Sequence, residues 1–122
     1  MLALALVACG GPDRETFVRE ANAACRDRAA GQEALGAVDE HELLPAATRL
    51  YEQELERLRA LEPTEEDRPR YVAWVRASEG VLVAWREFAA DPTDLAARRR
   101  VLNRFDRAAR IAGQLGLSQC DA

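Results

Sequence analysis

Apolar side chains recur every three or four residues through most of the chain, and polar side chains fill the positions between them. This spacing matches one face of an α-helix, and no segment shows a convincing apolar–polar alternation of the kind that marks an exposed strand. Proline, glycine and capping residues divide the pattern into four helical segments. The sequence therefore predicts an all-α protein.

The first predicted helix runs from about Asp13 to Ala30. Asp13 is a favourable N-cap, and Gly31 is a residue type that commonly ends a helix. The apolar positions of this segment share one face at helical spacing, and they are Phe17, Ala21, Ala24 and Cys25.

The second predicted helix ends near Leu61, before Pro63, and two starts are open. Either Asp39 caps the helix and Pro45 lies in its second turn, or Pro45 marks a later start. The expected apolar stripe comprises Leu43, Ala47, Leu50, Leu58 and Leu61, with Tyr51 and Leu55 beside it.

The third predicted helix begins after Thr64 or Asp67 and ends near Ala90. Asp67 is favoured as the cap, because Pro69 is tolerated only within a first turn. Its inner face is expected to contain Tyr71, Trp74, Val75, Ser78, Leu82, Trp85 and Ala89. Val72 and Val83 fall on the opposite face, either as scattered exposed residues or as part of a patch for a partner.

The fourth predicted helix begins at Asp91-Pro92, an N-cap followed by the favoured first-turn proline. It ends at Leu115-Gly116-Leu117, where a left-handed glycine and a following apolar contact are expected. The expected inner face comprises Leu95, Leu102, Phe105, Ala109 and Ala112. Because the helices are long and the connections mostly short, we expect an antiparallel four-helix bundle with up-down-up-down topology.

Residues 1–8 form an uncharged apolar run that is too short to span a membrane, which takes ~20 residues. They resemble the end of a signal-peptide apolar region, and Leu6-Val7-Ala8-Cys9 resembles the bacterial lipobox. The resemblance implies a lipid on the Cys9 thiol, cleavage before Cys9 and acylation of the new amino terminus. Residues 9–12 would then tether a bundle domain at 13–122.

The apolar run at residues 1–8 lacks a basic n-region, so we expect that the true start lies upstream or that the leader has been shortened. An ordinary secreted protein and a cytoplasmic protein with an apolar tail are the alternatives.

The composition and the cysteine count bound the class of protein. The 122 residues, 48% hydrophobic and 31% charged, fit one domain and exclude a polytopic membrane protein.

Three cysteines are an odd number, and the lipobox accounts for Cys9. In the predicted bundle the first and last helices are antiparallel neighbours, so the tail after Gly116 is expected to fold back and pair Cys120 with Cys25. Closing a loop of ~100 residues contributes ~4.7 kcal/mol in the chain-entropy model. The alternative is one buried cysteine and one idle terminal thiol.

Charge is divided unevenly along the chain. The net charge is −4, all 17 basic residues are arginines, and residues 92–122 carry six arginines against three acidic residues. Five arginines cluster opposite the apolar face of the last helix, and they are Arg99, Arg100, Arg104, Arg107 and Arg110. They are candidates for contact with anionic lipid headgroups or an acidic wall polymer. The alternative is a solvated face that pairs with the acidic first and second helices. No nucleic-acid partner is expected outside the cytoplasm.

Candidate chemistry is sparse, and the sequence predicts no catalytic residue, metal site or cofactor. His41 is the only histidine and is expected to be solvated, and there is no glycine-rich phosphate loop or nucleophile elbow. The glutamates, Glu54 among them, are expected mostly on solvated faces rather than as a catalytic pair. Tyr71, Trp74 and Trp85 share one face. They either pack in the core or line a site for an apolar ligand such as a lipid tail.

Three short motifs resemble small exported actinobacterial proteins that have no assigned activity. Phe17–Cys25 has their aromatic-led helix with an Ala-Asn-Ala core, Leu58–Pro63 has their L-x-x-L-x-P pattern, and Leu115–Cys120 has their glycine–apolar ending with a cysteine. The resemblance implies an extracytoplasmic location, a disulfide and a helical fold, and it transfers no catalytic residue. We therefore expect a non-catalytic, lipid-anchored domain of the cell envelope that contacts another envelope protein. The alternatives are a carrier or sensor of a small apolar ligand, and an ordinary secreted helical protein.

Overall fold

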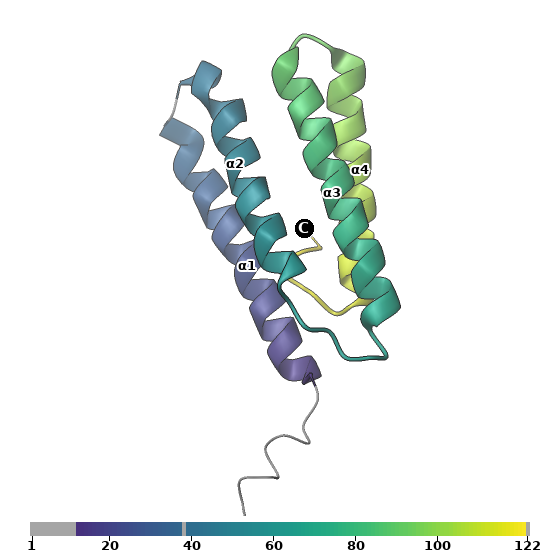
Figure 1. Cartoon of the computed structure of the whole chain (residues 1–122). Coiled ribbons are helices and arrows are strands. Elements are labelled where there is room, and N and C mark those ends of the chain that lie inside the picture. The colour runs from purple at the N-terminus through teal and green to yellow at the C-terminus, as the bar shows by residue number, and fades with distance from the viewer. Residues whose placement is uncertain (1–11, 38, 122) are drawn as a thin grey trace, which may run out of the picture.

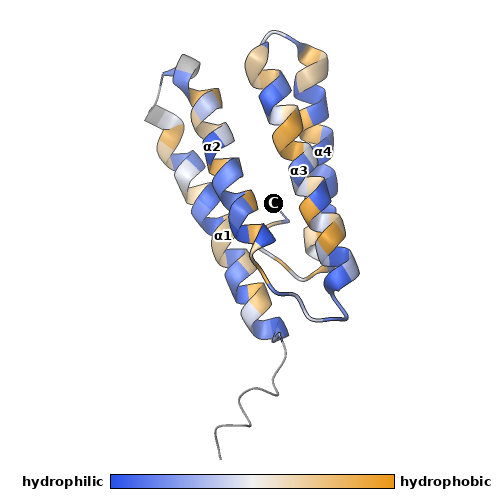
Figure 2. Cartoon of the chain, in the orientation of Figure 1, coloured by the Kyte–Doolittle hydropathy of each residue, from blue (hydrophilic) through white to orange (hydrophobic). Residues whose placement is uncertain are grey.

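The computed structural model describes residues 12–37 and 39–121, which form two antiparallel helical hairpins side by side (Figure 1). The elements in chain order are α1 (Arg14–Ala34), the short 3-10 helix η2 (Leu35–Ala37), α2 (Glu40–Arg59), α3 (Arg68–Ala90) and α4 (Leu95–Gln114). No strand forms within the described ranges. The predicted all-α bundle is therefore confirmed. Hydrophobic and hydrophilic residues alternate in short groups along all four helices, as the sequence pattern requires (Figure 2).

Helix α1 begins where the sequence predicts and ends later. The Asp13 carboxylate accepts a hydrogen bond from the main-chain N–H two residues further on, at 3.2 Å, which confirms the N-cap. The predicted end at Ala30 is wrong, because the helix continues through Gly31 to Ala34. A β-carbon on Gly31 would lie 2.8 Å from the Cδ2 atom of Leu50. Glycine at this position therefore permits the close approach of α2 and does not end the helix.

The earlier of the two open starts is correct for α2. The helix begins at Glu40, directly after Asp39, and Pro45 lies inside it. The buried face of α2 differs from the expected stripe. Leu43 is exposed, whereas Tyr51 and Leu55, which the sequence places beside the stripe, are buried. The buried apolar residues of α2 are Ala47, Tyr51, Leu55 and Leu58.

Helix α3 has the predicted bounds, with Asp67 immediately before it and a proline in its first turn. The Asp67 carboxylate forms no cap hydrogen bond and pairs with Arg14 at the start of α1. Its buried residues are Tyr71, Trp74, Ser78, Val81, Leu82 and Ala84. Val72 and Val83 are exposed, as expected for the opposite face.

The predicted start of α4 at Asp91-Pro92 is wrong by one short turn. The N-cap is Asp94, whose carboxylate accepts hydrogen bonds from the N–H groups of Ala96 and Ala97, the second and third residues of the helix, at 3.0 and 3.1 Å. Asp91 instead ends α3, and its carboxylate accepts from the Thr93 hydroxyl at 2.6 Å. Two aspartates therefore share the connection, and the one that reaches unpaired helix N–H groups caps α4.

The predicted inner face of α4 is also wrong in part. Leu95 and Leu102 are 71% and 58% exposed, and the buried residues of the helix are Ala97, Val101, Ala108 and Ala112. Small side chains let α4 pack closely on α3. Among the described residues, the backbones of α1 and α4 do not pack directly on each other. The two helices meet through side chains, since the Arg28 guanidinium of α1 lies 5.8 Å from the centre of the Phe105 ring of α4.

The C-terminal tail fills the space between α1 and the hairpin of α3 and α4. Gly116 has a φ of +76°, and the Leu117 N–H donates to the Ala112 carbonyl at 3.0 Å, which forms the predicted left-handed helix end. Figure 1 shows the tail entering the space between the hairpins. Leu115 and Leu117 are fully buried there, in one cluster with Phe17 of α1 and residues of α2 and α3.

Candidate functional site

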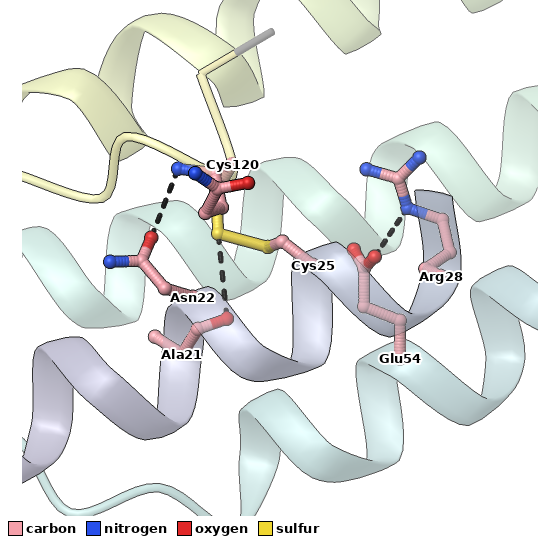
Figure 3. The surroundings of a disulfide bond; sticks show 7 residues. Ala21, Asn22, Cys25, Arg28, Glu54 and Cys120 are labelled. Atoms are coloured by element: carbon pink, nitrogen blue, oxygen red, sulfur yellow. Dashed lines mark hydrogen bonds and ion pairs between the residues drawn. A yellow bond between two sulfur atoms is a disulfide. The ribbon is translucent and has the colours of Figure 1, made fainter. Parts of the chain in front are cut away.

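Cys25 and Cys120 form a disulfide bond, with their Cα atoms 5.3 Å apart, at the point where the tail meets α1 (Figure 3). Both cysteines are buried. The Asn22 side-chain oxygen accepts a hydrogen bond from the Gln119 N–H at 3.0 Å, which holds the tail one turn from the bond. The predicted disulfide between the first helix and the C-terminal tail is therefore present.

A buried ion pair lies one turn along α1 from the disulfide (Figure 3). The Arg28 Nε–H donates to the Glu54 carboxylate, and the two side chains are only 7% and 8% exposed. The Arg28 guanidinium also donates to Gln32 at 2.7 Å and lies 4.9 Å from the centre of the Tyr51 ring. Arg28 therefore has hydrogen-bond, ionic and aromatic partners inside the bundle.

Sequence analysis missed this pair, because Glu54 is expected on a solvated face. The signal was present in the spacing. Arg28 follows Ala21, Ala24 and Cys25 at helical intervals, so it lies on the apolar face of α1. A charged residue in register with an apolar stripe indicates a buried partner, since an unpaired charge in the core is costly.

Burial controls the titration of the two acidic groups around Arg28. Loss of solvation raises the pKa of the Glu54 carboxyl above its ordinary value, and the nearby Arg28 charge opposes that rise. Burial likewise raises the pKa of the Tyr51 hydroxyl, again against the Arg28 charge. The cluster thus contains a fixed cation whose field favours an ionised Glu54, in a site where desolvation favours the neutral form.

The three rings proposed as a face for an apolar ligand are divided between two core clusters. Tyr71 and Trp74 are buried in the cluster around the tail, where Tyr71 packs 5.8 Å from Phe17 and donates a hydrogen bond to the Leu58 carbonyl. Trp85 packs in the other cluster, against Tyr51 at 6.0 Å. The interior space beside Trp74 has a volume of only about 20 Å³. The structure therefore does not bring all three rings together in one cluster. The carrier alternative stays a prediction from the sequence.

Comparisons with protein-family models, with curated proteins and with solved structures found no match for this chain. Within the described residues, no helix has both the length and the apolar character needed to cross a membrane. No three potential metal ligands of the His, Cys, Asp or Glu type gather among the described side chains.

The structure places the five arginines of the predicted anionic contact in different settings along α4. Arg100 pairs with Glu87 of α3 at 3.3 Å, and Arg110 pairs with an aspartate of its own helix at 3.4 Å. Arg104 donates to a main-chain carbonyl of α3 at 3.1 Å. Arg104 and Arg107 line a hollow between α3 and α4, whereas Arg99 is exposed and does not line it.

Two residues singled out in the sequence cannot be placed. Cys9, with the whole apolar run before it, lies outside the described residues. His41 belongs to the first turn of α2, and its side chain lies outside the described part of the structure. The lipid anchor and the role of the histidine therefore stay predictions from the sequence.

Proposed function

We propose that this protein is a non-catalytic domain of the cell envelope, anchored by lipid on Cys9, that acts by contact with another envelope component. The observation that supports the proposal is the buried Cys25–Cys120 disulfide. Structural disulfides form and persist in oxidising compartments outside the cytoplasm. The bond uses two of the three cysteines and leaves Cys9, in its lipobox-like setting, free for another use.

Lipid on Cys9 would hold the domain close to a membrane in one orientation. Each buried methylene contributes about 0.8 kcal/mol, so a single acyl chain binds reversibly and two or more anchor stably. Four extended residues from Cys9 to Asp13 reach roughly 14 Å at most. The end of the bundle that carries the start of α1, the α2–α3 connection and the end of α4 would therefore face the membrane (Figure 1).

The test is the intact mass of the mature protein recovered from membranes of the native host. The expected mass includes acyl groups on Cys9 and is lower by two hydrogens than that of the reduced protein. A Cys9→Ser variant is the matched control and should leave the membrane fraction while it keeps the disulfide. An unmodified and fully reduced chain would overturn both the anchor and the compartment. A disulfide-bonded chain without acyl mass would overturn the anchor and favour an ordinary secreted protein.

The interaction role is tested separately, by chemical crosslinking in intact cells. A reproducible heteromeric product that disappears with Cys9→Ser supports contact with an envelope component. Recovery of monomeric protein alone, under conditions that crosslink known envelope complexes, contradicts it.

A further inference from the structure

A hollow with a volume of about 370 Å³ lies on the surface between α3 and α4. Arginines enter it from both helices, and its remaining lining residues are small. The lining residues are Ala73, Arg76, Ala77, Gly80, Arg104 and Arg107. The volume lies within the range of pockets that take small ligands, which is roughly 300–1,000 Å³.

The local sequence explains why a hollow exists at this place. Ala73, Ala77 and Gly80 leave little side-chain volume on the α3 wall. The Arg104 guanidinium crosses from α4 and donates a hydrogen bond to the Gly80 carbonyl at 3.1 Å. One guanidinium is therefore held in position by the main chain, while Arg76 and Arg107 are exposed on either side of it.

The hollow carries positive charge that the two helices do not neutralise. Helices α3 and α4 contain ten arginines and three acidic residues, a net charge of +7. Each of the three acidic residues pairs with an arginine outside the hollow, and the pairs are Glu79–Arg59, Glu87–Arg100 and Asp106–Arg110. Within the described part of the chain, neither Arg76 nor Arg107 forms an ion pair.

We propose that this hollow is a binding site for a phosphate group. Guanidinium groups donate paired N–H bonds to phosphate oxygens in a fixed planar geometry. A phosphate group offers three acceptor oxygens and up to two negative charges, so it suits a hollow lined by three arginines better than a single carboxylate does. Arg76 and Arg107 bind from the two walls, and Arg104 binds from the position that the Gly80 carbonyl fixes. The hollow is larger than one phosphate, so it also accommodates part of the group that carries the phosphate. This site is independent of the anchor on Cys9.

The test compares two double variants of the full chain, each with Cys9→Ser so that no acyl group contributes. Arg76→Gln/Arg107→Gln removes the two unpaired guanidiniums of the hollow. Arg70→Gln/Arg98→Gln is the matched control, because it removes the same charge from one exposed position on each of the same two helices, and neither position lines the hollow. Thermal unfolding by circular dichroism establishes that both variants fold.

Binding is measured by titration with inorganic phosphate, followed by amide chemical shifts, and by flotation with vesicles of phosphatidylglycerol and phosphatidylcholine at a 1:3 ratio. We expect the hollow variant to bind at least tenfold more weakly than the parent and the control to stay within twofold. Saturation by inorganic phosphate identifies a free phosphate compound as the ligand source. Binding to vesicles alone identifies a lipid headgroup. Equal losses in the two variants, or no binding to either probe, would overturn the site.

Discussion

At the scale of single residues, Arg28 and Glu54 are the charges on which the fold depends most. They lie opposite each other between α1 and α2, and both are almost entirely buried. The attraction within a buried pair roughly offsets the cost of removing both charges from water, so the pair itself adds little stability. Removing one partner is different, because the remaining charge keeps its desolvation cost and loses its compensation.

We therefore predict that Arg28→Met lowers the free energy of unfolding by about 3–5 kcal/mol. Adding Glu54→Leu should recover most of this loss, because no buried charge is then left alone. The control is Arg57→Met, which breaks the exposed pair with Asp27 between the same two helices and should cost about 0–1 kcal/mol. Urea unfolding followed by circular dichroism measures the free energy of unfolding of the parent and of the three variants. Similar costs for Arg28→Met and Arg57→Met would contradict the burial of the pair.

The raised pKa of Glu54 predicts a pH dependence with a definite sign. Because its pKa is higher in the folded state than in the unfolded state, the folded protein binds the proton more readily. This carboxyl then contributes stability that is fully present below its unfolded pKa, roughly 4.3, and is lost as the pH rises through its folded pKa. The free energy of unfolding of the parent, minus that of Glu54→Gln, should therefore increase as the pH is lowered from 7 to 4. A difference that is constant or decreases would show that the pKa of Glu54 is not raised.

At the scale of the helices, the periodic apolar positions predict that each helix forms. They do not predict where a helix ends, because its ends depend on local packing and on capping hydrogen bonds. Gly31 has the residue type of a helix end, but the close approach of Leu50 gives that glycine another role. Asp91 and Asp94 are both good capping residues, and only the folded chain determines which of them meets free helix N–H groups. Sequence analysis therefore found all four helices and misplaced two of their ends.

Two glycines in or beside the helices should respond to alanine in opposite directions. Gly80 lies inside α3, and a β-carbon there would meet only the Arg104 side chain, at 3.8 Å. Gly80→Ala should therefore raise the free energy of unfolding by about 0.5–1 kcal/mol through helix propensity. Gly116 has a φ of +76°, so Gly116→Ala should lower it by about 1–2 kcal/mol. Thermal unfolding of the two variants checks the signs. Destabilisation by Gly80→Ala would contradict the open geometry around that position.

At the scale of the whole molecule, the two hairpins are joined by the packing of α2 on α3 and by a short tail that sequence periodicity cannot place. Leu115, Leu117 and Cys120 are too few to define a helical stripe, yet they occupy the space that the sequence assigns to a contact between α1 and α4. The pairing of the cysteines could be predicted from topology and export. The burial of Arg28 could be predicted from its place on the apolar stripe of α1. Its partner Glu54 and the hollow between α3 and α4 could not, because each depends on side chains from separate helices.

Loss of the disulfide should destabilise the whole molecule. For a loop of about 100 residues the chain-entropy model gives about 4.7 kcal/mol, and measured losses for small domains are about 2–5 kcal/mol. We predict a loss in that range for Cys25→Ala/Cys120→Ala, measured by chemical denaturation. Reductant should destabilise the parent by a similar amount and leave the double variant unchanged. An effect below about 1 kcal/mol would show that packing between the hairpins holds them together without the bond.

The position of the disulfide also determines how the molecule responds to mechanical force. The bond joins residues 95 positions apart in the sequence, near the two ends of the folded part. If tension is applied to the chain before Cys25 and after Cys120, the load passes through the first turns of α1 directly into the sulfur–sulfur bond. Residues 26–119 lie outside that path and cannot be extended while the bond is intact. A pull on both ends would therefore strip only the start of α1 from the bundle and leave the rest of the fold unloaded.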